Sequence, residues 1–172
     1  MNDLIRHVRT IPDFPTPGIQ FRDLTPLMAD PAALRASAEQ LCAPFRSESI
    51  ALVAAIEARG FIFGALVARE LDAGFVPLRK PGKLPGQVEK VSYALEYGSA
   101  SLEIHSDALE HGARVLLIDD VLATGGTAAA AAQLLQRLGA QVAGIAFLLE
   151  IAALNGRARL TDGVRVHSVL QV

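Results

Sequence analysis

The sequence feature that most constrains the fold is the stretch 115–127, which reads Val-Leu-Leu-Ile-Asp-Asp-Val-Leu-Ala-Thr-Gly-Gly-Thr. Its four leading apolar residues are typical of a strand that is buried on both faces of a parallel sheet. Two adjacent carboxylates, Asp119 and Asp120, follow that run, and then come a loop of small residues over 123–127 and a helical pattern over 128–138. The stretch therefore predicts a buried strand, an acidic pair, a glycine loop and a helix, in that order.

This arrangement is typical of a ligand site, because ligands bind outside the carboxyl ends of the strands in open α/β sheets. Loop glycines let backbone N–H groups approach an anion, and a helix N-terminus adds partial positive charge. Two carboxylates would repel a phosphate, but they can accept hydrogen bonds from sugar hydroxyls or hold Mg²⁺. A ribose 5-phosphate satisfies both halves of the motif; the alternative is a capped helix beside solvated aspartates. The motifs G-x-x-x-x-G-K-[ST] and G-x-G-x-x-G are absent.

A second apolar run, 50–56, precedes Glu57-Ala58-Arg59-Gly60 and a helical pattern over 61–71, which repeats the plan of the first motif. An arginine at a turn is usually solvated. Here Arg59 is expected at the same sheet edge as the aspartates, which favours a diphosphate clamp. A later segment, 79–86, reads Arg-Lys-Pro-Gly-Lys-Leu-Pro-Gly and is either a solvated basic loop or a site that neutralises a polyphosphate.

The N-terminal part carries several prolines between residues 11 and 26, which predict an extended, preorganised loop rather than a regular helix. This loop is either an arm packed on the domain or a binding flap with Phe21 as an aromatic platform. A helix is expected over 31–45 with Asp30 as its N-cap. Further along, 92–104 reads as a hairpin around Tyr97-Gly98.

Charge and composition narrow the function classes. The 172 residues carry a net charge of −2 with both signs dispersed, which argues against a general nucleic-acid binder. The single cysteine, Cys42, excludes an intrachain disulfide framework and favours a packing role. The chain shows no signal peptide and no apolar run of about 18 residues. We therefore expect a cytoplasmic protein that binds neither nucleic acid nor membrane.

Several motifs together resemble one known family. The stretch 115–127 resembles the phosphoribosyl-diphosphate binding motif of type I phosphoribosyltransferases. The stretch 13–27 resembles the base-binding hood of the adenine-specific members of that family, 79–86 resembles its basic loop, and 93–98 resembles its mobile catalytic loop. The motifs occur in the expected order over residues 11 to 160.

The resemblance implies the fold. We expect an α/β, single-domain, three-layer phosphoribosyltransferase fold over 1–172, with a mostly parallel central sheet flanked by helices. An N-terminal base-binding hood is expected over 11–26, and a flexible catalytic loop, or lid hairpin, over 80–98.

The resemblance also implies a role for each group of site residues. The residues expected to bind the ribose 5-phosphate are Asp119, Asp120, Ala123, Thr124, Gly125, Gly126 and Thr127. Those expected to bind diphosphate are Glu57, Ala58, Arg59, Gly60, Arg79, Lys80 and Lys83. The base would stack on Phe21 and bond to the main chain of Gln20 and Arg22. The residues expected to act in catalysis are Glu96, Tyr97 and Arg59.

The implied reaction is the transfer of a 5-phosphoribosyl group from 5-phosphoribosyl 1-diphosphate to adenine, giving AMP and diphosphate in purine salvage. Mg²⁺ is the implied cofactor, held mainly by the substrate, with Asp119 and Asp120 contacting it through water. The implied partners are these small molecules and a second copy of the chain in a homodimer. Two alternatives remain open: transfer to another purine base, or a non-catalytic nucleotide-binding regulator of the same fold.

Overall fold

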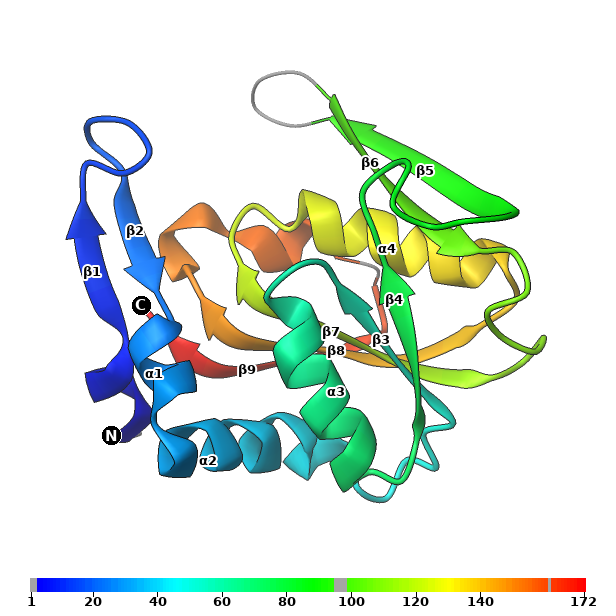
Figure 1. Ribbon diagram of the computed structural model, residues 1–172, viewed down its shortest axis with the longest axis horizontal. Helices are drawn as coiled ribbons and strands as arrows, with labels where there is room; N and C mark the ends of the chain where they lie inside the picture. Colours follow the sequence, from blue (N-terminus) through cyan, green and yellow to red (C-terminus); the bar gives the residue numbers. More distant parts are fainter. Residues whose placement is uncertain (1–2, 95–98, 161) are drawn as a thin grey trace.

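The computed structural model describes residues 3–94, 99–160 and 162–172. Its centre is a five-stranded parallel sheet in the order β4-β3-β7-β8-β9 (Figure 1). The bounds of these strands are Leu52–Ile56 for β3, Gly74–Leu78 for β4, Arg114–Leu122 for β7, Gln141–Glu150 for β8 and Arg165–Gln171 for β9. The predicted parallel sheet is confirmed, with β7 at its centre.

Helices cover both faces of the sheet, as predicted. The helices α2 (Pro31–Cys42) and α3 (Gly60–Glu70) pack on one face, and α4 (Gly126–Arg137) packs on the other (Figure 1). Side chains along β7 alternate between the two cores: Val115 and Leu117 join the α4 side, whereas Leu116 joins the α2–α3 side. Both faces are buried, which is why the strand reads as a continuous apolar run.

The N-terminal segment differs in detail from the expected extended loop. After a short 3₁₀ helix, η1 (Asp3–His7), strands β1 (Arg9–Pro12) and β2 (Gln20–Asp23) form an antiparallel hairpin. The helix α1 (Thr25–Ala29) follows, with Pro26 in its first turn, where a missing N–H breaks no helical hydrogen bond. Pro12 therefore ends β1 and Pro26 lies in the first turn of α1, whereas Pro15 and Pro17 lie in the irregular loop that joins β1 to β2.

The helix expected over 31–45 begins as predicted and ends earlier. The Asp30 carboxylate accepts a hydrogen bond from the Ala33 N–H at 2.8 Å, as an N-cap does. The helix ends at Cys42, and Pro44 lies in a 3₁₀ turn, η2 (Ala43–Phe45), because proline lacks the N–H that an α-helix needs. Cys42 is buried, and burial raises the pKa of its thiol, in keeping with a packing role.

A second hairpin projects beyond α4 (Figure 1). Its strands are β5 (Val88–Ala94) and β6 (Ser99–His105), paired from Val88–His105 to Ala94–Ser99. This confirms the predicted hairpin, although β5 begins earlier than expected. Two 3₁₀ turns, η3 (Ala152–Leu154) and η4 (Gly156–Arg159), join β8 to β9. In the described part of the chain, no helix is long and apolar enough to cross a membrane.

Candidate active site

A cavity of about 930 Å³ lies at the carboxyl edge of the sheet. Its walls come from β2, the β3–α3 turn, the loop after β4, strand β6 and the β7–α4 connection. The predicted site residues in its lining are Gln20, Phe21, Arg22, Glu57, Ala58, Arg59, Lys80, Asp119, Asp120, Ala123 and Thr127. Segments that lie as far apart in sequence as the hood and the β7–α4 loop thus meet in one cavity.

The acidic pair lies inside the last part of β7 rather than after it. The Asp120 carboxylate is buried and accepts a hydrogen bond from the Arg59 Nε–H. The Asp120 N–H donates to Asp119 Oδ1 at 2.9 Å. Burial and the neighbouring Asp120 carboxylate raise the pKa of Asp119 well above its usual value. Only one of the two carboxylates therefore has a cationic side-chain partner in hydrogen-bond contact.

Arg59 connects the acidic pair to the hood. Its guanidinium carbon lies 5.9 Å from the centroid of the Phe21 ring, within the range of a cation–π contact. Phe14 in turn packs edge-to-face on Phe21, with ring centroids 5.1 Å apart. Phe21 is therefore held from two sides, which presents a fixed ring to the cavity.

The β3–α3 turn also anchors the basic loop. Glu57 Oε2 accepts hydrogen bonds from Arg79 Nε at 2.9 Å and from the Lys80 N–H at 3.0 Å. Arg79 Nη1 donates to the Lys83 carbonyl oxygen at 3.1 Å. The peptide bond between Glu57 and Ala58 is cis. Arg79 and Lys83 are absent from the cavity lining, so Lys80 is the predicted basic-loop cation that reaches it.

The glycine loop has the backbone geometry that its sequence suggests. Gly125 adopts a left-handed conformation with φ of +81°, and α4 begins at Gly126. Ala123 and Thr127 line the cavity, whereas Thr124, Gly125 and Gly126 do not. Gly60, at the start of α3, lies against the acidic pair, because a methyl group added there would lie 2.8 Å from Asp119 Oδ1.

Two predicted catalytic residues are not among the residues that the structure describes, and several residues of the cavity lining were not predicted. The predicted catalytic residues Glu96 and Tyr97 lie outside the described residues. The sequence interpretation did not single out the apolar lining residues Ile19, Ile56, Leu102, Val121 and Ile151. Such residues look like core residues in a sequence, so no local sequence signal marks them as part of a site.

The carboxylates at the cavity are suited to a divalent cation that is bound together with a substrate. Within residues 3–94, 99–160 and 162–172, no three His, Cys, Asp or Glu side chains gather into a metal cage. The oxygen ligands at the cavity are the carboxylates of Asp119, Asp120 and Glu57. Mg²⁺ is commonly bound by one or two carboxylates together with substrate phosphates, so these residues fit a cation that arrives with its substrate.

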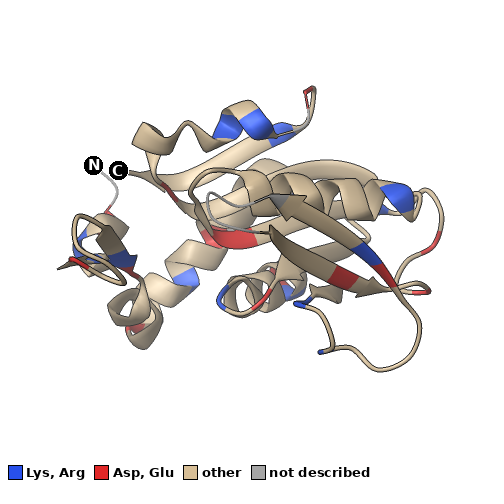
Figure 2. Cartoon of the chain, turned by 90° about the horizontal axis from the view of Figure 1, so that it is seen from above, with Lys and Arg blue, Asp and Glu red and all other residues tan. Residues whose placement is uncertain are grey.

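Charged residues of both signs are spread over helices, strands and loops (Figure 2). The electrostatics of the site therefore depend on local pairs such as Arg59–Asp120 and Arg79–Glu57.

Comparison with known proteins agrees with this geometry. The family model for the phosphoribosyl transferase domain matches residues 27–164. The adenine phosphoribosyltransferase of Methylococcus capsulatus is 61% identical over 170 residues, which cover 99% of each chain. The crystal structure of the enzyme of that name from Rhodothermus marinus superposes with a TM-score of 0.94, at 54% identity over 98% of this chain and 96% of the other.

A third relative carries ligands. The adenine phosphoribosyltransferase of Saccharomyces cerevisiae, crystallised with an imino-altritol bisphosphate and adenine, superposes with a TM-score of 0.91 at 37% identity, over 97% of this chain and 96% of the other. The similarity thus extends over the hood, the sheet and the cavity. This chain belongs to the phosphoribosyltransferase family, within the group of adenine phosphoribosyltransferases.

Proposed function

We propose that this protein transfers the 5-phosphoribosyl group of 5-phosphoribosyl 1-diphosphate to adenine, giving AMP and diphosphate in purine salvage. The observation that carries the proposal is the single cavity that joins an aromatic hood, a cationic turn and an acidic pair beside a glycine loop. A relative named for this activity, 61% identical over nearly the whole chain, supports it.

The acidic pair would orient the sugar. Asp119 and Asp120 accept hydrogen bonds from the two ribose hydroxyls, and the 123–127 loop with the α4 N-terminus binds the 5-phosphate. The ribose is then held at both ends, with its anomeric carbon facing the centre of the cavity. Fixing a reactant in this way removes part of the entropic barrier.

The cations would accept the leaving diphosphate. The bond between the anomeric carbon and the diphosphate oxygen breaks, and its electron pair leaves with diphosphate. The purine nitrogen forms the new bond on the opposite face and releases its proton, which the departing diphosphate takes up. Arg59 and Lys80 lie where they can bind that anion. When bound, Mg²⁺ would supply further charge stabilisation of the diphosphate, with Asp119 and Asp120 contacting it through water.

The hood would select the base. The purine stacks on Phe21, and the main chain of Gln20 and Arg22 bonds its edge. In the described residues, β1 is the only strand hydrogen-bonded to β2, so the other edge of β2 is available for such bonds. Adenine presents an amino donor beside a ring acceptor, whereas hypoxanthine presents the opposite pattern and would leave these groups unpaired.

The remaining assignments belong to the same proposal. The protein acts in the cytoplasm as a homodimer, with residues 11–26 as the hood and 80–98 as the catalytic loop that carries Glu96 and Tyr97. Two exposed apolar side chains support an interface with a second copy: Ile62 on α3 is 41% exposed, and Phe75 on the neighbouring strand β4 is 38% exposed.

The proposal is tested by a coupled assay of AMP formation with adenine, hypoxanthine, guanine and xanthine. We expect turnover with adenine that requires both Mg²⁺ and 5-phosphoribosyl 1-diphosphate, and a preference for adenine of about 10²-fold or more. Equal rates with hypoxanthine or guanine would overturn the hood assignment. Binding of AMP without any turnover would instead identify a regulator that keeps the fold.

A further inference from the structure

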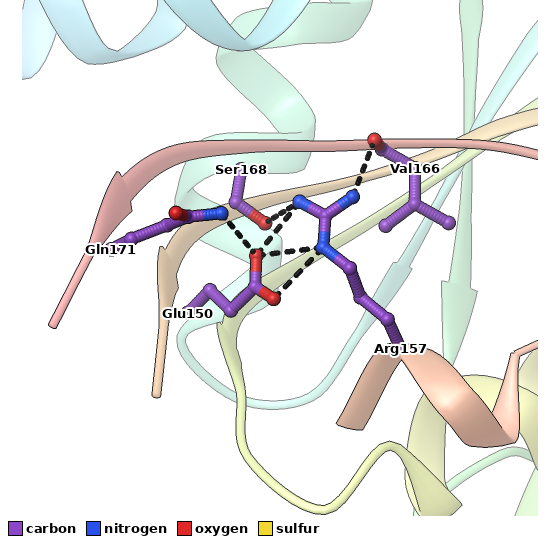
Figure 3. A network of polar contacts seen from close by, with 5 residues as sticks. All are labelled: Glu150, Arg157, Val166, Ser168 and Gln171. Atoms are coloured by element: carbon purple, nitrogen blue, oxygen red, sulfur yellow. Dashed lines mark hydrogen bonds and ion pairs between the residues drawn. The ribbon is translucent and has the colours of Figure 1, made fainter. Parts of the chain in front are cut away.

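A network of polar contacts joins the end of β8, the turn η4 and strand β9 (Figure 3). Glu150, the last residue of β8, is buried, with 7% of its side chain exposed. Arg157, in η4, donates from Nε to Glu150 Oε1 at 2.8 Å and to Oε2 at 3.0 Å, and from Nη2 to Oε2 at 2.7 Å. A forked pair of this kind fixes orientation as well as distance.

The rest of the guanidinium is also bound. Arg157 Nη1 donates to the Val166 carbonyl at 3.1 Å, and Nη2 donates to Ser168 Oγ at 3.2 Å. Gln171 Nε2 donates to Glu150 Oε2 at 3.2 Å. The Arg157 hydrogen bonds lower the pKa of Glu150, and Glu150 raises the pKa of Arg157, so the pair is ionised at neutral pH. Arg157 therefore ties η4 to both β8 and β9.

The residue before Arg157 touches the glycine loop. A methyl group added at Gly156 would lie 2.2 Å from the Ala123 carbonyl oxygen, and one added at Gly125 would lie 2.1 Å from the Gly156 carbonyl oxygen. The two segments therefore pack backbone against backbone, at a distance that only glycine allows at both positions. A shift of Gly156 would have to move Gly125 or open a gap beside it.

Few buried side chains flank Gly156. Gly156 is buried, but residues 152–155 and 157–159 are exposed, and Leu160 is the next buried side chain. Apolar burial therefore contributes little to the position of η4. The turn has backbone hydrogen bonds of its own, from the Ala158 N–H to the Asn155 carbonyl at 3.2 Å and from the Leu160 N–H to the Arg157 carbonyl at 3.0 Å, and these stay within the turn. The side-chain contacts of Arg157 with Glu150 and β9 tie the turn to the sheet.

We propose that Arg157 is a positioning residue: anchored on Glu150 and β9, it presses Gly156 against the 123–127 loop and so fixes the backbone that binds the 5-phosphate. This inference rests on the proposed function, which places that phosphate at the loop. Arg157 does not line the cavity, so its effect on ligands passes through the loop. It should influence ligands that carry the phosphate and leave the base site unchanged.

The test measures the affinities of ribose 5-phosphate, AMP and adenine by calorimetry for the wild type and for Arg157→Gln. We expect the variant to bind ribose 5-phosphate and AMP about tenfold more weakly, because a displaced loop loses its alignment with the phosphate. Adenine should bind within about twofold of the wild type, because the hood lies elsewhere. In turnover, the KM for 5-phosphoribosyl 1-diphosphate should rise while the KM for adenine stays constant.

Matched variants separate positioning from general stability. Arg114→Gln removes a similar forked contact, from Arg114 to the Glu48 carboxylate at 2.8 Å and its carbonyl at 2.7 Å, at the start of β7. It should lower the thermal midpoint without changing the affinity for ribose 5-phosphate. Arg157→Lys keeps the charge but not the fork and should fall between wild type and Arg157→Gln. Ser168→Ala removes only the hydroxyl that contacts Arg157 and Glu150, and it should give the same selective loss at smaller size if Arg157→Gln does not fold.

Three results would overturn the inference: unchanged ribose 5-phosphate affinity in folded Arg157 variants, an equal loss for ribose 5-phosphate and adenine, or an equal selective loss in Arg114→Gln. A wild-type protein that binds neither ribose 5-phosphate nor AMP would instead refute the proposed function, and with it the role of the loop.

Discussion

The β3–α3 and β7–α4 connections follow the same plan and carry opposite charges into one cavity. Both begin as buried parallel strands and end at the start of a helix. The β3–α3 turn presents Arg59, whereas the last part of β7 presents Asp119 and Asp120. The two meet directly in the ion pair between Arg59 and Asp120.

The two connections share one strand–turn–helix arrangement, but their charges suit different parts of the substrate, the diphosphate and the ribose. The cationic turn suits the departing diphosphate, and the acidic pair suits the ribose hydroxyls. Each turn supplies a partner for the other's charge, since Arg59 donates a hydrogen bond to Asp120. Substrate binding would exchange this contact for contacts with the ligand, so the two turns should act together.

The largest effect is expected from removing the charge of the β7 side. In Asp119→Asn/Asp120→Asn, kcat/KM for 5-phosphoribosyl 1-diphosphate should fall by about 10²-fold or more, because the sugar hydroxyls lose their charged acceptors. Steady-state kinetics measures this, with circular dichroism as the check on folding. The control Asp107→Asn/Glu110→Gln alters two exposed acids outside this cavity and should leave the rate unchanged. A wild-type rate in the double variant would refute the role of the pair.

Removing the cation of the β3 side should have the next largest effect. In Arg59→Gln, kcat/KM should fall by about 10- to 100-fold, because the diphosphate loses a charge-assisted partner. Arg46→Gln is the matched control, since Arg46 forms an exposed ion pair with Glu70 at 3.5 Å. Diphosphate inhibition should weaken in Arg59→Gln and not in the control. Equal inhibition of both variants would contradict the assignment of the turn.

A smaller and more selective effect is expected at the hood, which contacts the cationic turn through Phe21. Phe21→Ala should raise the KM for adenine by about tenfold, since stacking of a base on an aromatic ring contributes about 1–3 kcal/mol. The KM for 5-phosphoribosyl 1-diphosphate should change little. Phe21→Tyr keeps the ring and should retain the affinity for adenine. A variant without the ring that keeps its KM for adenine would exclude stacking.

The smallest expected effect is on stability, and its sign differs from that on activity. The pKa of Asp119 is higher in the folded protein than in the unfolded chain, where it is about 4. Asp119 therefore contributes to the free energy of unfolding below about pH 4, and this contribution is lost as the pH rises through the folded-state pKa. Asp119→Asn removes this loss and should raise the thermal midpoint at pH 7 by about 2 °C or more. The gain should shrink toward pH 4 in scanning calorimetry. A lower midpoint than wild type at pH 7 would show that the ionised carboxylate stabilises the fold.

The sequence predicts the parts of this site that depend on local pattern. The run before Asp119 is apolar because β7 is buried on both faces, and Asp30 caps a helix by a bond three residues away. Both features are encoded within a few residues, so periodicity and capping rules are enough to find them.

Contacts between segments that are distant in the sequence could not be predicted from such local patterns. Arg59 and Asp120 lie 61 positions apart, and nothing in either local sequence fixes which arginine meets which carboxylate. The same holds for the pair of Glu57 and Arg79. Arg79 was predicted to bind diphosphate, but it pairs with Glu57 and does not line the cavity. Such pairs follow from strand order and register, which the sequence specifies only through the whole fold.

The central claim is that the two connections form one catalytic unit, and a double-mutant cycle tests it most directly. The cycle compares kcat/KM of Arg59→Gln, Asp120→Asn and the combined variant with that of the wild type. If the turns act as a unit, the combined variant should be about as slow as the slower single variant, because either change already disrupts the shared site. Losses that multiply would contradict this account and show two independent sites.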